Sequence, residues 1–142
     1  MEKNKPAIKI MKVMVFGAFD ILHPGHINFF EQAKKHGNHL VVVVARDNTI
    51  NQVKNHIPQK PQNDRLEAVQ NQPAVDQAVL GYEDDKYRII REIAPDIICL
   101  GYDQIAFTEL LETKLKEFDL NTKVVRLKPF YPEKFKSSKL NK

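Results

Sequence analysis

The stretch Val13–Gly37, VMVFGAFDILHPGHINFFEQAKKHG, decides the fold of this chain. It opens with the apolar run Val13–Phe16, which stops at a glycine, and helix-like spacing begins after His23 and His26. A short apolar run that gives way to a helical periodicity is typical of a buried strand followed by an amphipathic helix. The stretch therefore predicts a strand–loop–helix unit with two histidines at the start of the helix.

Further β-branched or apolar runs follow along the chain: Leu40–Ala45, Ala78–Leu80, Ile97–Leu100 and Val124–Leu127. Segments with helical spacing separate several of them, around Ile27–Lys34, Tyr87–Ile93 and Phe107–Phe118. Near-continuous apolar strands that alternate with amphipathic helices indicate a parallel sheet covered on both faces. We therefore predict an α/β fold, a single Rossmann-like doubly wound domain over residues 1–142 with a five-stranded parallel sheet. Residues 1–11 are a candidate flexible extension.

The segment between the second and third predicted strands is weakly patterned. Residues Asn48–Asn63 contain two prolines and several amides, which predicts a loop with one short helical turn. A helix is expected after it, with Asn63 or Asp64 as the capping residue. Pro95 is expected to close the helix that precedes the fourth strand.

Length and composition fit a globular domain. The chain has 142 residues, enough for one hydrophobic core, of which 42% are hydrophobic and 28% charged. No segment approaches the ~20 apolar residues that a membrane-spanning helix needs, so no membrane partner is expected. The single cysteine, Cys99, lies in an apolar run and cannot form an internal disulfide, which favours a reducing, cytoplasmic location.

The charge balance is basic. The formal net charge is +4 and the isoelectric point is about 9.1, a surplus that attracts phosphate groups and nucleic acids alike. No basic stripe alternates with aromatic residues, as a stacking platform for nucleic acid requires. We therefore expect a solvated basic surface with a phosphate pocket and no nucleic-acid partner.

The tetrapeptide HPGH has the features of an anion site. If the helix begins near Pro24 or Gly25, its first amides lack partners within the helix and carry partial positive charge. Proline in the first turn loses no helical hydrogen bond, and glycine lets a ligand approach the backbone. The imidazoles of His23 and His26 can donate hydrogen bonds to phosphate oxygens. The arrangement suits a polyphosphate.

Two other interpretations of the histidine pair stay open on spacing alone. Both rings can be packed core residues. They can also bind a metal ion, although Asp20 is the only close carboxylate and no cysteine lies nearby.

Upstream of the histidines, Gly17 permits a ligand to approach the backbone at the end of the first strand, and Ala18 and Phe19 continue the wall of the cleft.

Chemically rich segments follow four of the predicted strands: GAFDILHPGH, ARDNT, GYED and GYDQ. In open α/β sheets, ligands bind where loops leave the carboxyl ends of the strands, near the switch in strand order. The sequence therefore predicts one site built from these four segments.

The stretch GAFDILHPGHINFFEQAKKHGNHLVVVVARD resembles the first half of the cytidylyltransferase-like nucleotidyltransferase superfamily, whose signature is H-x-G-H after a first strand that ends G-x-F-D. VDQAVLGYED resembles its third strand, IREIAPDIICLGYDQ its fourth and FKSSKL its late Ser/Thr-rich segment. Among the branches, VVARD with LGYDQ is most similar to the archaeal-type FAD synthases, which are FMN adenylyltransferases. The resemblance covers almost the whole chain.

The resemblance implies an enzyme that transfers AMP from ATP to FMN and releases pyrophosphate. The acceptor phosphate attacks the α-phosphorus directly, and Mg²⁺ accompanies the substrate without a metal ligand from the protein. Alternatives are the use of CTP, or of glycerol 3-phosphate or a sugar phosphate as acceptor. A nucleotide-binding regulatory module without turnover is the non-enzyme alternative. The resemblance also favours a homodimer.

The resemblance assigns roles to particular residues. It implies that His23 and His26 stabilise the transition state. The implied nucleotide contacts, besides the two histidines, are Gly17, Ala18, Phe19, Pro24, Gly25, Asp103, Arg126, Ser137 and Ser138. The candidate acceptor contacts are Asp20, Arg46 and Arg65, and the guanidinium groups of the two arginines match phosphate geometry. A surface ion pair with Asp47 is the alternative for Arg46, and a flexible end is the alternative for the serine pair.

Overall fold

The computed structural model describes residues 9–54, 57–102, 104 and 110–129. In chain order the elements are β1 (Lys12–Gly17), α1 (Pro24–Lys34), β2 (His39–Val44), α2 (Asp47–Lys54), α3 (Gln62–Gln70), β3 (Gln77–Leu80), α4 (Arg88–Ile93), β4 (Ile97–Leu100), α5 (Leu111–Glu117) and β5 (Lys123–Arg126). All five strands that the sequence predicts are present.

The five strands form one sheet in the order β3-β2-β1-β4-β5, and every neighbouring pair is parallel. The predicted Rossmann-like, five-stranded parallel sheet is confirmed. Strand β1 lies at the centre and pairs with β2 on one side and β4 on the other. The strand order reverses between β1 and β4, which makes their carboxyl ends the switch point where such sheets bind ligands.

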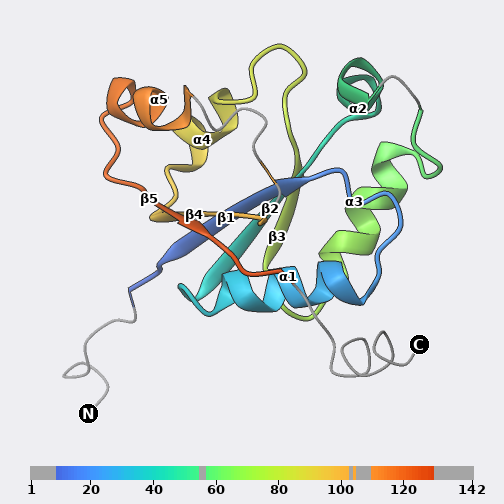
Figure 1. Cartoon of the computed structure of the whole chain (residues 1–142), viewed down its shortest axis with the longest axis horizontal. Helices are drawn as coiled ribbons and strands as arrows, with labels where there is room; N and C mark the ends of the chain where they lie inside the picture. The colour runs from blue at the N-terminus through green and yellow to red at the C-terminus, as the bar shows by residue number, and fades with distance from the viewer. Residues whose placement is uncertain (1–8, 55–56, 103, 105–109, 130–142) are drawn as a thin grey trace, which may run out of the picture.

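Helices cover both faces of the sheet. Helices α1 and α3 lie on one side, and α4 and α5 lie on the other (Figure 1). In β1, Val13 and Val15 pack toward Phe30 of α1, whereas Met14 packs with Ile90 of α4. Because both faces are buried, strand β2 is a continuous apolar run after its first residue rather than an alternating one.

The strand ends are aligned by backbone hydrogen bonds at one edge of the sheet. The amide of Ala45 donates to Gly17 at 2.9 Å, and the amide of Gly81 donates to Val44 at 3.0 Å. On the other side of β1, the amide of Leu127 donates to Leu100 at 2.8 Å. The four segments singled out from the sequence therefore leave the sheet at the same edge.

The connection between β2 and β3 is more helical than the sequence predicts. Residues Asp47–Lys54 form α2, a helix of 8 residues instead of a single turn. Ile50 of α2 is only 4% exposed. Its burial stabilises a helix whose sequence has only a weak helical periodicity. Helix α3 starts at Gln62 after Pro61 and has no side-chain cap, so the predicted capping by Asn63 or Asp64 is wrong.

The helix before β4 ends as predicted. Helix α4 stops at Ile93, and Ala94 adopts a left-handed conformation with φ of 51° just before Pro95. The predicted helix over 107–118 is described only from residue 110, and α5 occupies Leu111–Glu117. In the part of the chain that the structure describes, no helix has the length and apolar character needed to cross a membrane.

Candidate active site

The two histidines cap the first turn of α1 for each other. His23 is the N-cap residue, and its Nδ1 accepts a hydrogen bond from the amide of Gly25 at 3.1 Å. The Nδ1 of His26 accepts from the backbone amide of His23 at 3.3 Å. This reciprocal pattern is a capping box, a role that Ser or Thr and Glu or Gln usually fill.

The capping bonds fix the tautomer of both rings. Because each Nδ1 accepts a hydrogen bond, the proton of the neutral imidazole must sit on Nε2. The rings of His23 and His26 stack with centroids 3.9 Å apart and planes 30° apart. No protein group among the described residues accepts from either Nε2. The pair therefore presents two adjacent N–H donors to a ligand.

Burial keeps the His26 ring neutral. Burial, followed by the charge of His23, lowers the pKa of His26 from 6.5 to about 4. The ring of Phe19 meets His26 edge-on, with centroids 5.4 Å apart and an interplanar angle of 77°. His23 is exposed, whereas His26 is half-buried. Near neutral pH, His26 acts as a hydrogen-bond donor and not as a cation.

The first amides of α1 are occupied, which differs from the expectation that they bind phosphate. The amide of Gly25 donates to the ring of His23, and the amides of His26 and Ile27 donate to the carbonyl of His23 at 2.9 and 3.2 Å. Pro24 has no amide proton. The imidazoles, rather than the helix amides, are therefore the donors that this loop offers.

Phe19 shapes the loop that carries the histidines. Its φ of 53° is left-handed, its side chain is buried, and its ring lies 5.1 Å from that of Phe30. A Cβ atom on Gly17 would lie 2.5 Å from Cζ of Phe19. The missing side chain at Gly17 therefore makes room for the Phe19 ring, whereas the sequence suggested room for a ligand.

A second network closes the loop after β4 onto the end of β1. The side-chain amide of Gln104 donates to the carbonyl of Phe16 at 2.9 Å and accepts from the amide of Gly101 at 2.8 Å. Gln104 thus bridges the switch point between β1 and β4. We did not identify it from the sequence, where its position in the GYDQ segment after a buried strand is the only signal. The neighbouring candidate, Asp103, lies outside the described residues.

Arg126 at the end of β5 belongs to the same network. Its guanidinium donates to the carbonyls of Gly101 at 2.8 Å and Gln104 at 2.7 Å. The side chain therefore supports the loop of the expected nucleotide site. The two other late candidates, Ser137 and Ser138, lie outside the described residues.

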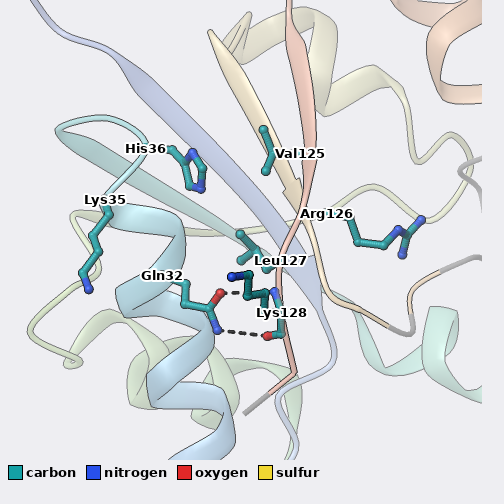
Figure 2. A pocket seen from close by; sticks show the side chains of 7 residues that line it. All are labelled: Gln32, Lys35, His36, Val125, Arg126, Leu127 and Lys128. Carbon is teal, nitrogen blue, oxygen red and sulfur yellow. Dashed lines mark hydrogen bonds between the residues drawn. The ribbon is translucent and has the colours of Figure 1, made fainter.

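An open groove of about 410 Å³ lies between α1 and β5, and neither His23 nor His26 lines it. Figure 2 shows its lining, which is Gln32, Lys35, His36, Val125, Arg126, Leu127 and Lys128. The side chain of Gln32 bonds both backbone groups of Lys128, at 3.0 and 3.2 Å. These bonds attach the segment after β5 to α1, while the Arg126 side chain points away from that helix (Figure 2).

The three candidate acceptor residues have different surroundings. Asp20 accepts hydrogen bonds from the amides of Gln59 and Lys60, both at 2.8 Å. Arg46 is half-buried and donates from Nε to the carbonyl of Gly81 at 2.7 Å. This bond places it beside the carboxyl end of β3.

Arg65 is not placed to contact an acceptor. Its side chain is buried, with the residue 1% exposed, and Nε, NH1 and NH2 all donate to protein oxygens. A guanidinium in this state has no exposed face to offer a phosphate, which corrects the expectation from the sequence.

A metal site within the protein does not fit the described side chains. Over the described part of the chain, no group of three or more His, Cys, Asp or Glu residues is placed to hold an ion. Cys99 is fully buried in β4, and burial raises the pKa of its thiol to about 11. Its thiol therefore stays protonated, and it is not a thiolate ligand.

The sequence of this chain is similar to those of known nucleotidyltransferase-like proteins. The sequence profile of the cytidylyltransferase-like family matches residues 14–141. The FAD synthase of Methanohalophilus mahii is 48% identical over 118 residues, 82% of this chain and 80% of that protein. The FAD synthase of Aciduliprofundum boonei is 45% identical over 121 residues, 85% of this chain and 80% of that protein.

A solved structure gives the same result for the fold. The crystal structure of the lipopolysaccharide core biosynthesis protein from Thermoplasma volcanium matches with a TM-score of 0.80 and 41% identity, over 86% of this chain and 99% of that one. The resemblance drawn from the H-x-G-H and G-x-F-D motifs is confirmed. The chain belongs to the cytidylyltransferase-like family.

Proposed function

We propose that this protein is an FMN adenylyltransferase, which makes FAD and pyrophosphate from ATP and FMN. Similarity to proteins named FAD synthase over about four fifths of their length supports this activity. The observation that carries the proposal is the histidine pair: both Nδ1 atoms are used for capping, so both Nε2–H groups are available to a triphosphate.

The proposed reaction is a direct phosphoryl-group displacement. A phosphate oxygen of FMN attacks the α-phosphorus of ATP, and the bond from that phosphorus to the oxygen that joins it to the β-phosphorus breaks, so that this oxygen leaves with pyrophosphate. His23 and His26 donate hydrogen bonds from Nε2 to the phosphate oxygens, where negative charge grows in the transition state. Because His26 is neutral, it stabilises this charge without supplying a proton.

Other nucleotide contacts are proposed near the carboxyl ends of the strands. We propose that the backbone of Gly17, Ala18 and Phe19 lines the nucleotide, and that Pro24 and Gly25 let the triphosphate approach the start of α1. Asp103, Arg126, Ser137 and Ser138 are predicted nucleotide contacts on the basis of family resemblance.

On the acceptor side, Arg46 is the proposed phosphate contact, since only its Nε is engaged among the described residues. Asp20 is proposed to act indirectly, because it holds the amides of Gln59 and Lys60 beside the loop.

Mg²⁺ is the proposed divalent cation. It would neutralise charge on the β- and γ-phosphates, and oxygen atoms of the substrate and of water would hold it. A homodimer, a cytoplasmic location and the lack of a nucleic-acid or membrane partner are likewise proposals. The lone buried thiol of Cys99 supports a reducing location.

A sugar phosphate is the second candidate acceptor. One protein of similar structure, at 41% identity, is named a lipopolysaccharide core biosynthesis protein, whereas other relatives are named FAD synthase. CTP is the alternative nucleotide, because base selection depends on a few backbone contacts and on the width of the pocket.

A single assay tests these alternatives. The purified protein is incubated with Mg²⁺ and either ATP or CTP, together with FMN, glycerol 3-phosphate or sugar phosphates, and pyrophosphate release is measured. We expect release with ATP and FMN, with one FAD formed for each pyrophosphate. Release with CTP and glycerol 3-phosphate, or with a sugar phosphate alone, would replace the proposed acceptor. Nucleotide binding without turnover in every combination would favour the regulatory module.

A further inference from the structure

Arg65 is the only charged residue that is buried in the described part of the chain. Its guanidinium donates to four oxygens: Lys60 O from Nε at 2.9 Å, Ala18 O and Ala45 O from NH1 at 2.8 and 2.7 Å, and Asp47 Oδ1 from NH2 at 2.7 Å. A buried cation is costly unless it is paired and hydrogen-bonded. Four hydrogen bonds from a side chain with five N–H donors show that the site is built around the guanidinium.

The partners of Arg65 come from separate segments of the chain. Ala18 directly follows β1, and Ala45 directly follows β2. Asp47 is the first residue of α2, and Lys60 lies just before α3. A planar guanidinium with donors in a fixed fork can hold such convergent oxygens in one geometry, and a lysine cannot. Arg65 therefore ties the carboxyl ends of two central strands to the start of two helices.

The hydrogen bond to Ala18 leads directly to the histidines. Ala18 precedes Phe19, whose backbone is left-handed with φ of 53° and whose ring packs edge-on against His26. A non-glycine residue holds this conformation only when its surroundings enforce it. We propose that Arg65 is a positioning residue for the histidine pair, because it fixes the Ala18 carbonyl and thereby the turn at Phe19 on which the His26 ring rests.

Asp20 holds the same loop from the other side. The amide of Lys60 donates to Asp20 at 2.8 Å, while the carbonyl of Lys60 accepts from Arg65 at 2.9 Å. The backbone amide and the backbone carbonyl of Lys60, just before α3, are therefore both hydrogen-bonded to side chains. Together these contacts join the loop of residues 18–23 to α3, so a change at Arg65 is transmitted to the histidines.

The test replaces Arg65 by lysine and compares it with Val69→Ala. Both residues lie on α3 and are buried, but Val69 packs in the core on the α1 side of the sheet, and its side chain has no hydrogen-bond donor that could bind a loop carbonyl. For each variant, NMR titration gives the pKa of the His26 ring, and single-turnover kinetics give the rate of FAD formation. Circular dichroism confirms that each variant is folded under the assay conditions.

We expect Arg65→Lys to raise the pKa of His26 toward 6.5, because the ring loses its packing against Phe19. The single-turnover rate should fall by about 10- to 100-fold, the size expected when catalytic groups are displaced slightly, with ATP affinity changed by only about threefold. Val69→Ala should keep the wild-type values of both. Wild-type values in Arg65→Lys would overturn the proposal.

If Arg65→Lys does not fold, Asp47→Ala removes one partner of the same guanidinium and should shift the pKa of His26 in the same direction by less; an unchanged pKa would overturn the proposal. The effect on rate rests on the proposed adenylyl transfer, but the pKa of His26 does not. If the wild type makes no FAD, the titration alone decides whether Arg65 positions the ring.

Discussion

The backbone amide of His23 donates to Nδ1 of His26, and the rings of the two residues stack at 3.9 Å. We propose that this pair of side chains has two functions. The Nδ1 atoms cap the start of α1, which leaves the Nε2–H groups for the proposed hydrogen bonds to the triphosphate. Substitutions that remove one function and keep the other can separate them.

His23→Asn is expected to keep the helix cap and lose activity. Asparagine is a strong N-cap residue, so its side-chain oxygen replaces Nδ1, but it is too short to replace Nε2–H. The free energy of unfolding should stay within about 0.5 kcal/mol of the wild type, whereas His23→Ala should lose about 1 kcal/mol. Urea unfolding measures this, and single-turnover FAD formation should be slow in both variants. Full activity in His23→Asn would show that His23 serves only as a cap.

The stability of the protein should depend on pH through His26. Its pKa is lowered from 6.5 to about 4 in the folded state, so between these values the unfolded chain binds a proton that the folded protein does not. The free energy of unfolding should therefore decrease as pH falls from about 6.5 to about 4, and this dependence should level off below that range. Urea unfolding at several pH values tests it.

His26→Gln is the control for the pH experiment. Glutamine is a standard partner in a capping box, so the helix start is retained while the titrating group is removed. The variant should lose less stability than the wild type over the same pH window. Equal losses in both proteins would mean that other groups carry the effect.

Gly17→Ala is expected to destabilise the protein. The new Cβ would lie 2.5 Å from Cζ of the buried Phe19 ring, so the ring must move. Overpacking of this kind costs about 1–3 kcal/mol. Gly81→Ala, whose Cβ would lie 3.1 Å from Cγ1 of Val43, is a milder control. The double variant Gly17→Ala with Phe19→Leu should recover part of the loss relative to the sum of the single changes, and full additivity would contradict the clash.

Gln104→Ala should weaken ATP binding more than it weakens the fold. The side chain bonds Phe16 and Gly101 at the switch point, so its loss frees the loop that contains the predicted nucleoside contact. We expect KM for ATP to rise by about 10-fold, the equivalent of one or two hydrogen bonds. Gln32→Ala, which releases Lys128 from α1 instead, is the matched control. Equal effects of the two changes on KM would argue against a local role for Gln104.

The sequence predicts the sheet well because the information is local. Each strand is a short apolar run, and the chemically rich loops follow the strands directly, so the shared edge of the site follows from parallel topology. Helix α2 is longer than its own pattern predicts, because its stability comes from burial of Ile50.

The roles of individual site residues are harder to predict, because they depend on contacts between distant segments. Arg65 has a side chain suited to binding phosphate. In the folded chain, however, it is buried against the carbonyls of Ala18 and Ala45, which lie 47 and 20 residues earlier in the sequence. Gly17 is expected from the sequence to face a ligand, but the left-handed turn at Phe19 places a ring there. Neither arrangement leaves a periodic signal in the sequence.

We propose that the Nε2–H groups of the histidine pair stabilise the transition state of adenylyl transfer. The most direct test is His26→Ala, with single-turnover FAD formation measured at saturating ATP and FMN and with the ATP dissociation constant measured separately. We predict that the rate falls by about 100- to 1,000-fold, as for loss of an oxyanion donor, while the dissociation constant changes by less than about threefold. A loss of ATP affinity of that size, with no fall in the single-turnover rate, would contradict this role and show that the imidazole only aids binding.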